Sequence, residues 1–225
     1  MSQPSAQARP PGRQAQRREQ TRARLVAAAR TLLARQGADA TRINEITTEA
    51  DLGFGSFYNH FSSKEAIVEA VLQETVAAHG AAVEAVTGLL EDPAEVVAAA
   101  HRYFVRMART DPDLGWLLIR LESSHNVMLA ALAPYAERDL DRGIAAGRFR
   151  VADRRVALYG TAGALLAVMR AVLDGRAPPG ADSAHAEGIL GMLGVPAEEA
   201  IEIARRPMPA VRSEPARLRR GPGVR

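Results

Sequence analysis

The sequence of 225 residues contains no cysteine and few aromatic side chains. The absence of cysteine excludes disulfide bonds and thiolate metal sites, which fits a reducing cytoplasm. Aromatic residues make up 4% of the chain and hydrophobic residues 47%, so the core must consist mainly of alanine, leucine and valine. Because strands favour β-branched and aromatic residues, this composition favours an all-α fold.

Several other sequence signatures are missing. No apolar run approaches the roughly 20 residues that cross a membrane. The basic N-terminus lacks the apolar segment of a secretory signal, so we expect a cytoplasmic protein with no membrane partner. No nucleophile elbow, P-loop or complete dinucleotide fingerprint is present. The five histidines are dispersed without an i, i+4 pair: His60, His79, His101, His125 and His185. We therefore expect no enzymatic activity, no metal and no cofactor.

The segment from Thr41 to Glu65 has the pattern of two short helices joined by a tight turn, followed by the start of a third. Ile43, Ile46 and Ala50 recur at helical spacing and form one apolar stripe, with Thr41 as the expected N-cap. Asp51 tolerates a left-handed backbone, which suits the turn, and Gly53 is an acceptable N-cap for the second helix. The pattern predicts a helix-turn-helix.

The second of these helices carries aromatic, small and amide side chains. Phe57 and Phe61 are four residues apart and are expected to face inward, so that Phe54, Ser56, Asn59 and His60 point elsewhere. No acidic residue occurs between Gly53 and Ser63. Ser62 and Glu65 form the pattern of a capping box for the next helix, with Lys64 beside its N-terminus. An element without acidic groups is suited to lie against DNA.

These residues resemble the helix-turn-helix of TetR-type transcriptional regulators. The resemblance rests on ADLGFGSFYNHF, from Ala50 to Phe61, and on the Ser63-Lys64-Glu65 that follows. Three positions depart from the family pattern: Asp51 replaces glycine, Gly53 replaces serine, and Phe54 occupies a position that is often polar or basic. DNA contacts near Gly53 and Phe54 are therefore expected to differ from those of relatives. The segment from Gly188 to Pro209 also resembles the C-terminal region of some members.

Charge and composition suggest four regions. Residues 1–18 form an expected disordered basic arm, which either contacts DNA or is solvated, and residues 206–225 a disordered basic tail with six Arg and one Glu. Residues 19–66 are the expected DNA-binding domain, whose first helix runs from about Glu19 to Gln36. Residues 67–205 are expected to form a helical domain for ligand binding and dimerisation, as the resemblance implies.

The candidate site residues fall into three groups. Those expected to contact DNA, rather than only solvent, are Arg22, Thr41, Arg42, Gly53, Phe54, Gly55, Ser56, Tyr58, Asn59, His60 and Lys64. A ligand pocket is implied by the family, and its candidate residues, each with core packing or simple exposure as the alternative, are Tyr103, Arg106, Trp116, Arg120, His125, Asn126, Tyr135 and Tyr159.

A third group lies on one face of the helix expected over residues 153–173. Its small residues recur at spacings of three and four, so that another helix can approach closely: Gly160, Gly163, Ala164, Ala167 and Ala171. In the family the last two long helices of each subunit form a four-helix dimer bundle. We therefore expect helices 153–173 and 182–193 to form a homodimer interface, with packing inside one chain as the alternative.

The resemblance implies a homodimeric repressor that occupies a pseudo-palindromic DNA operator and is released by a small-molecule effector. One alternative is a ligand-independent activator or architectural DNA-binding factor. A second is a helical enzyme or scavenging binder with a vestigial N-terminal domain, for which the sequence offers no catalytic constellation.

Overall fold

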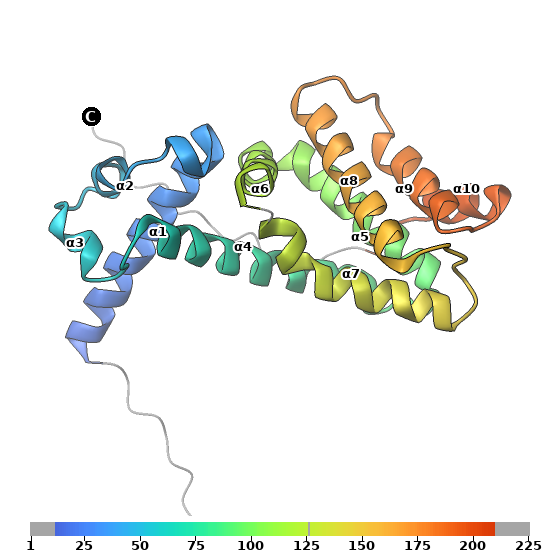
Figure 1. Cartoon of the computed structure of the whole chain (residues 1–225), viewed down its shortest axis with the longest axis horizontal. Helices are drawn as coiled ribbons and strands as arrows, with labels where there is room; N and C mark the ends of the chain where they lie inside the picture. Colours follow the sequence, from blue (N-terminus) through green and yellow to red (C-terminus); the bar gives the residue numbers. More distant parts are fainter. Residues whose placement is uncertain (1–11, 126, 210–225) are drawn as a thin grey trace, which may run out of the picture. The chain divides into compact units, whose positions relative to one another are not determined.

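A computed structural model describes residues 12–125 and 127–209, and the side chains of these residues outside 122–132. In this part of the chain there are ten helices and no strand, which confirms the all-α expectation. The helices are α1 (Arg13–Ala40), α2 (Ile43–Glu49), α3 (Gly55–Tyr58), α4 (Lys64–Thr87), α5 (Pro93–Thr110), α6 (Pro112–His125), α7 (Val127–Ala145), α8 (Arg154–Leu173), α9 (Ala181–Met192) and α10 (Ala197–Arg205). Figure 1 shows their order along the chain.

The chain divides into two compact units. The first, here called the N-terminal unit, comprises Met1–Val76 and Met107–Ala131, and the second, the C-terminal unit, comprises Ala77–Arg106 and Leu132–Arg225. Helices α4, α5 and α7 each contribute residues to both units, and α6 belongs to the N-terminal unit.

The core of the N-terminal unit is built from α1, α2, α3, α4 and α6. The apolar stripe of α1 supplies Leu25 and Leu33, and both are fully buried together with Phe57 of α3. Leu117 and Leu121 of α6 enter the same core. Helix α1 begins earlier than expected, at Arg13, and its regular helical geometry is interrupted at Gly37, which has φ +79°. Only glycine adopts this backbone conformation without strain, so Gly37 ends the straight part of the helix near the expected position.

Two of the expected helix caps are wrong by one residue. Thr41 does not cap α2, because its side chain is buried and its hydroxyl donates to the Gly37 carbonyl at 2.6 Å. Arg42 precedes α2 instead, and its N–H donates to the Glu45 carboxylate at 2.8 Å. Ser62 is likewise not the cap of α4, since the side chain of Ser63 accepts from Ala66 N–H at 3.3 Å.

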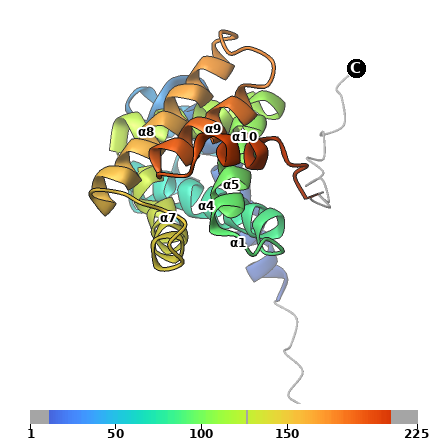
Figure 2. The same cartoon turned by 90° about the vertical axis from the view of Figure 1, so that its right-hand side faces the viewer.

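In the C-terminal unit, α8, α9 and α10 lie next to one another, in orange to red in Figure 2. Their apolar side chains share a core with α5 and α7, in which Ala186, Ile189 and Leu190 of α9 are almost completely buried. Aspartates cap α5, α6 and α8: the carboxylates of Asp92, Asp111 and Asp153 accept backbone N–H groups of the first turn at 3.0, 3.1 and 2.9 Å.

Helix α8 differs from the expectation that no apolar segment approaches membrane-spanning length. Among the helices that the structure describes, it alone is long and apolar enough to cross a membrane by length and composition, and 22% of its apolar window is buried within this chain. Val156 and Tyr159 on α8 are 69% and 60% exposed, and Met192 at the end of α9 is 52% exposed. Part of the apolar surface of α8 is therefore not covered by its own chain.

Two histidines meet inside the C-terminal unit. His101 Nδ1 of α5 lies 3.0 Å from His185 Nε2 of α9, so one imidazole donates to the other. Burial lowers the pKa of His101 to about 3, with a smaller effect from His185, and burial lowers the pKa of His185 to about 4. Both rings are therefore neutral in the folded protein at neutral pH.

This pair predicts a loss of stability in mild acid. In the unfolded chain an imidazole takes up a proton near pH 6.5, whereas the folded pair resists protonation until pH 3–4. The unfolded state thus binds more protons below pH 6.5, and the free energy of unfolding falls as pH decreases through that window. In His185→Gln, which cannot be protonated, the loss between pH 6.5 and 5 should be smaller by up to about 2 kcal/mol.

Urea denaturation at the two pH values measures this difference. His60→Gln, which removes a histidine of the N-terminal unit, serves as the control and should reduce the acid sensitivity less. An unchanged acid sensitivity in His185→Gln would contradict the assignment.

Candidate DNA-binding interface

The turn between α2 and α3 is fixed by its backbone. Asp51 has φ +51°, which confirms the expected left-handed conformation, and it is the one non-glycine residue with positive φ among the described residues. The N–H groups of Asp51 and Leu52 donate to Thr48 and Thr47 carbonyls at 3.0 and 2.9 Å. Leu52 is half-buried against the core of the unit. The chain therefore turns sharply out of α2 with its backbone groups paired.

An arginine of α1 holds this turn from outside. Arg24 Nη2 donates to the carbonyls of Ala50 and Asp51 at 2.6 and 2.9 Å, and lies 3.2 Å from the Asp51 carboxylate. These carbonyls end α2 and would otherwise depend on water. Arg24 was missed in the sequence, because nothing within α1 indicates that this arginine contacts residues 26 and 27 positions away.

Helix α3 presents one aromatic face inward and one outward. Phe57 and Phe61 are buried as predicted, whereas Phe54 and Tyr58 are 53% and 54% exposed. The ring centroids of Phe54 and Tyr58 are 5.7 Å apart, and those of Tyr58 and Phe57 are 5.4 Å apart, both edge to face. Such pairs are favourable ring arrangements, so the exposed rings are oriented by the buried ones.

The two glycines beside these rings have no packing role in the chain itself. A Cβ atom added to Gly53 or Gly55 would meet no atom within 4 Å, and neither residue has a positive φ. Phe54, rather than Gly53, immediately precedes α3, but its backbone is already helical and the Gly53 carbonyl accepts from Ser56 N–H at 2.9 Å. The surface at Gly53 and Gly55 is therefore open to a partner.

The remaining candidates on α3 are polar and accessible. Asn59 is exposed, and Ser56 and His60 are half-buried. Partial burial, then the charges of Arg18 and Arg22, lower the pKa of His60 below its usual value. His60 is therefore neutral at neutral pH and offers hydrogen-bonding groups rather than a positive charge.

The side chains outside α3 that are predicted to contact DNA differ in exposure and in their existing contacts. Arg42 is exposed, but the buried Thr41 offers a partner no side-chain group. Arg22 lies 3.0 Å from the Glu74 carboxylate and 5.5 Å from the Phe61 ring centroid. Lys64 Nζ donates to the Ala38 carbonyl at 3.0 Å. Arg22 and Lys64 thus hold helices of the unit together as well as supplying positive charge near α3.

The predicted ligand residues are divided between the two units. Trp116 and Arg120 lie in the N-terminal unit, where the Arg120 guanidinium stacks 5.0 Å from the Trp116 ring centroid and donates to the Ala34 carbonyl. Tyr103, Arg106, Tyr135 and Tyr159 lie in the C-terminal unit. Asn126 falls outside the described residues. For His125 only the backbone is described, and it lies in α6.

Within the C-terminal unit, two of these tyrosines lie beside α4. Tyr103 Oη is 2.9 Å from His79 Nδ1, and a Cβ at Gly80 would lie 3.5 Å from Tyr135 Oη. Arg106, in contrast, donates to the Asp182 carboxylate at 2.6 Å at the start of α9. Tyr159 is exposed on α8. The Tyr103 hydroxyl thus meets the His79 imidazole, and the Tyr135 hydroxyl lies beside Gly80 of the same helix.

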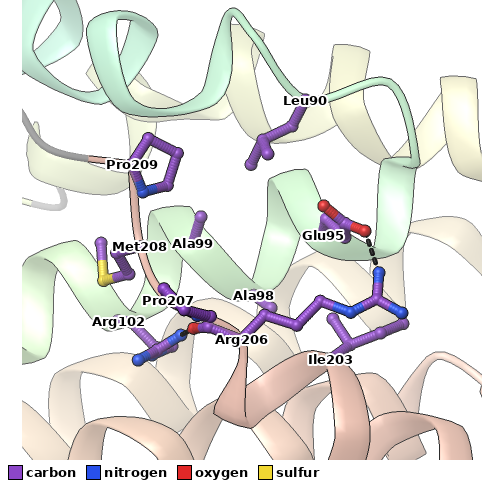
Figure 3. Close-up of a pocket in the computed structure, with 10 residues that line it drawn as sticks. All are labelled: Leu90, Glu95, Ala98, Ala99, Arg102, Ile203, Arg206, Pro207, Met208 and Pro209. Carbon is purple, nitrogen blue, oxygen red and sulfur yellow. Dashed lines mark hydrogen bonds and ion pairs between the residues drawn. The ribbon is translucent and has the colours of Figure 1, made fainter.

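A small cavity in the same unit contains none of the predicted ligand residues. It is lined by α5, by the end of α10 and by the segment after it: Leu90, Glu95, Ala98, Ala99, Arg102, Ile203, Arg206, Pro207, Met208 and Pro209. As Figure 3 shows, Arg206 pairs with Glu95, while Arg102 Nη1 donates to the Arg206 carbonyl at 2.6 Å. These contacts attach residues 206–209 to α5.

The small-residue face of α8 divides into two parts. A Cβ on Gly160 would lie 3.1 Å from Met192 Cε of α9, and Ala164 packs against the core, so these residues pack within the chain. Gly163 and Ala167 are exposed, and a Cβ on Gly163 would meet nothing within 4 Å. Ala171 is half-buried.

Comparison with known proteins identifies the class to which this arrangement belongs. Residues 25–71 match the model described as bacterial regulatory proteins of the tetR family, and residues 92–206 match that of the tetracyclin repressor-like C-terminal domain. The chain therefore belongs to the TetR family of transcriptional regulators. No curated protein matched the chain.

Solved structures give the same result. RolR in complex with resorcinol is 41% identical, with a TM-score of 0.69 over 88% of this chain and 99% of that one. RolR without ligand is 38% identical, with a TM-score of 0.66 over 84% and 99%. FadR from Bacillus subtilis in complex with stearoyl-CoA is 19% identical, with a TM-score of 0.62 over 76% and 96%, and shows a shared fold.

The role of Arg24 can be tested by mutation. Arg24→Ala removes the hydrogen bonds to the turn and should lower the free energy of unfolding by about 1 kcal/mol, because the carbonyl groups are left to water. Arg30→Ala is the matched control on the same helix. Its carboxylate partner Glu74 lies 3.6 Å away at the surface, so its loss should have little effect. Urea denaturation of both variants measures the difference, and equal stability would remove the proposed role of Arg24.

Proposed function

We propose that this protein is a repressor that binds a pseudo-palindromic operator as a homodimer and is released by a small-molecule effector. The observation that carries the DNA-binding part is the surface of α3. It has two exposed aromatic rings, two glycines with open space around them and accessible amide, hydroxyl and imidazole groups. Inserted in a major groove, Asn59 and Ser56 would lie near base edges, and the Tyr58 hydroxyl near a phosphate. In this proposal the DNA-binding domain spans residues 19–66, as expected from the sequence.

The dimer is proposed from the apolar surface that α8 and α9 leave uncovered. Val156, Tyr159, Gly163 and Ala167 form an exposed stripe along α8. On α9 the exposed residues are equally apolar or small: Ala184, Gly188, Gly191 and Met192. An apolar face of this kind on a protein in water marks an interaction surface. A second copy of the chain would cover it by a self-complementary contact, as two-fold symmetry requires.

The effector is proposed from the likeness to RolR. That protein was solved with resorcinol, a benzene ring carrying two hydroxyl groups. The C-terminal unit of this chain offers matching hydrogen-bond groups in His79, Tyr103 and Tyr135. We therefore propose a small hydroxylated aromatic compound as effector. Release requires that the compound bind the DNA-incompetent arrangement more tightly than the DNA-bound one.

Two other functions remain as alternatives to this proposal. A ligand-independent activator or architectural factor would use the same α3 surface but would not respond to any metabolite. An enzyme or scavenging binder would bind a metabolite without sequence-selective DNA binding. The likeness to DNA-binding regulators favours the repressor, which would act in the cytoplasm beside the chromosome without metal or cofactor.

Selection from a random DNA pool tests the function. The protein should enrich a sequence with two inverted half-sites, separated so that two α3 helices reach successive major grooves on one side of the duplex. Saturating resorcinol should then weaken operator binding by about tenfold or more, within the usual range of allosteric coupling. 1,3-Dimethoxybenzene, which lacks the hydroxyl donors, is the matched control. Selective DNA binding without any displacement by hydroxylated aromatics would favour the ligand-independent alternative.

The dimer face has its own test. Gly163→Arg places a charged side chain at an exposed position with open space around it, so the fold of one chain should be preserved while pairing is lost. Ala136→Arg, at an exposed position of α7, is the control and should remain dimeric. Sedimentation velocity at micromolar concentration separates the two states. If the wild-type protein were monomeric, or if the Gly163→Arg variant remained dimeric, the proposed interface would be wrong.

A further inference from the structure

The N-terminal unit exposes large apolar side chains at one place. Among the side chains that the structure describes in this unit, the exposed large apolar residues are Phe54 and Tyr58. They lie four residues apart on the same side of α3, with ring centroids 5.7 Å apart. Tyr58 has a hydroxyl group that can donate to a phosphate, but Phe54 has no polar atom. The exposure of the Phe54 ring is therefore not explained by a backbone contact with DNA.

The Phe54 ring is held in a defined orientation. It contacts Tyr58 edge to face, Tyr58 contacts Phe57 in the same way, and Phe57 is fully buried in the core. Because the outer ring packs on an inner one, it loses little conformational freedom when a partner covers it. Gly53 and Gly55 on either side leave open space, so a partner can approach the ring closely.

The chemistry of the major groove specifies what an apolar ring can recognise there. Base edges in this groove present hydrogen-bond donors and acceptors, and the single apolar group among them is the 5-methyl group of thymine. We propose that Phe54 contacts the 5-methyl group of one thymine in each half-site and so makes a T·A pair at that position a requirement of the operator. This specificity rests on the proposed binding of α3 in the major groove.

The experiment uses the operator that the full-length protein selects from a random pool. Each thymine is replaced in turn by deoxyuridine, which keeps the base pair and removes the methyl group. At one position per half-site the replacement should weaken wild-type binding by about fourfold for each methyl group lost. Phe54→Ala should bind the thymine and deoxyuridine operators equally, while Phe54→Leu, which keeps an apolar side chain, should retain a preference for thymine.

A gain of contact provides an independent measurement. The T·A pair is replaced by C·G, with either cytosine or 5-methylcytosine at that position. The wild type should bind the operator with 5-methylcytosine more tightly, and Phe54→Ala should bind the two operators equally. Tyr58→Phe is the control, because loss of a phosphate contact should weaken binding to both operators by the same factor.

The outcomes separate the two proposals. The methyl contact is wrong if deoxyuridine has no effect on wild-type binding at any position. It is also wrong if Phe54→Ala keeps the preference for thymine. Neither result would contradict operator binding itself. Equal loss of affinity for all DNA in Phe54→Ala would also overturn the methyl contact, since the ring would then support binding without recognising a base. If the protein selects no sequence from the pool, the proposed repressor function fails first, and this inference fails with it.

Discussion

The burial of Phe57 and Phe61 is the constraint on which the DNA-binding surface depends. Helix α3 has four residues and cannot be stable alone, so its position is set by what it buries. With Phe57 in the core beside Leu25 and Leu33, the helix can rotate no further. Phe54 and Tyr58, on the neighbouring side, then face outward. The same interaction that stabilises the unit thus determines which side chains face a partner.

In the C-terminal unit, the apolar helix α8 is covered by its own chain on one side only. One side of α8 is buried through Leu158, Leu165 and Met169, while Val156 and Tyr159 are exposed to water. The membrane-like composition of α8 is accounted for if its second side is buried by another protein surface. The division of its small residues fits this view: Gly160 lets α9 approach within the chain, and Gly163 stays available for a second contact.

Local features were predictable from the sequence, and contacts between distant residues were not. The left-handed Asp51, the caps at Asp92, Asp111 and Asp153 and the inward Phe57 all depend on neighbours within a few positions. Thr41 and Ser62 were misjudged by one residue, because the Thr41 hydroxyl is taken by Gly37 and Ser63 takes the place of Ser62. The contact of Arg24 with the turn, the contact of Met192 with Gly160 and the assignment of Trp116 and Tyr103 to different units all require the tertiary fold. Chain periodicity carries no information about them.

The membership of α6 in the N-terminal unit has a topological consequence. The polypeptide leaves this unit after Val76, returns at Met107 and leaves again after Ala131. Residues 77–106 therefore interrupt the N-terminal unit in the sequence. All three junctions lie inside helices, in α4, α5 and α7, and none lies in a loop. A protein fragment that stops near residue 76 would lack Leu117 and Leu121 and expose the core they fill. The chain therefore passes from one unit to the other within helical segments, and a cut at any of these junctions would interrupt a helix.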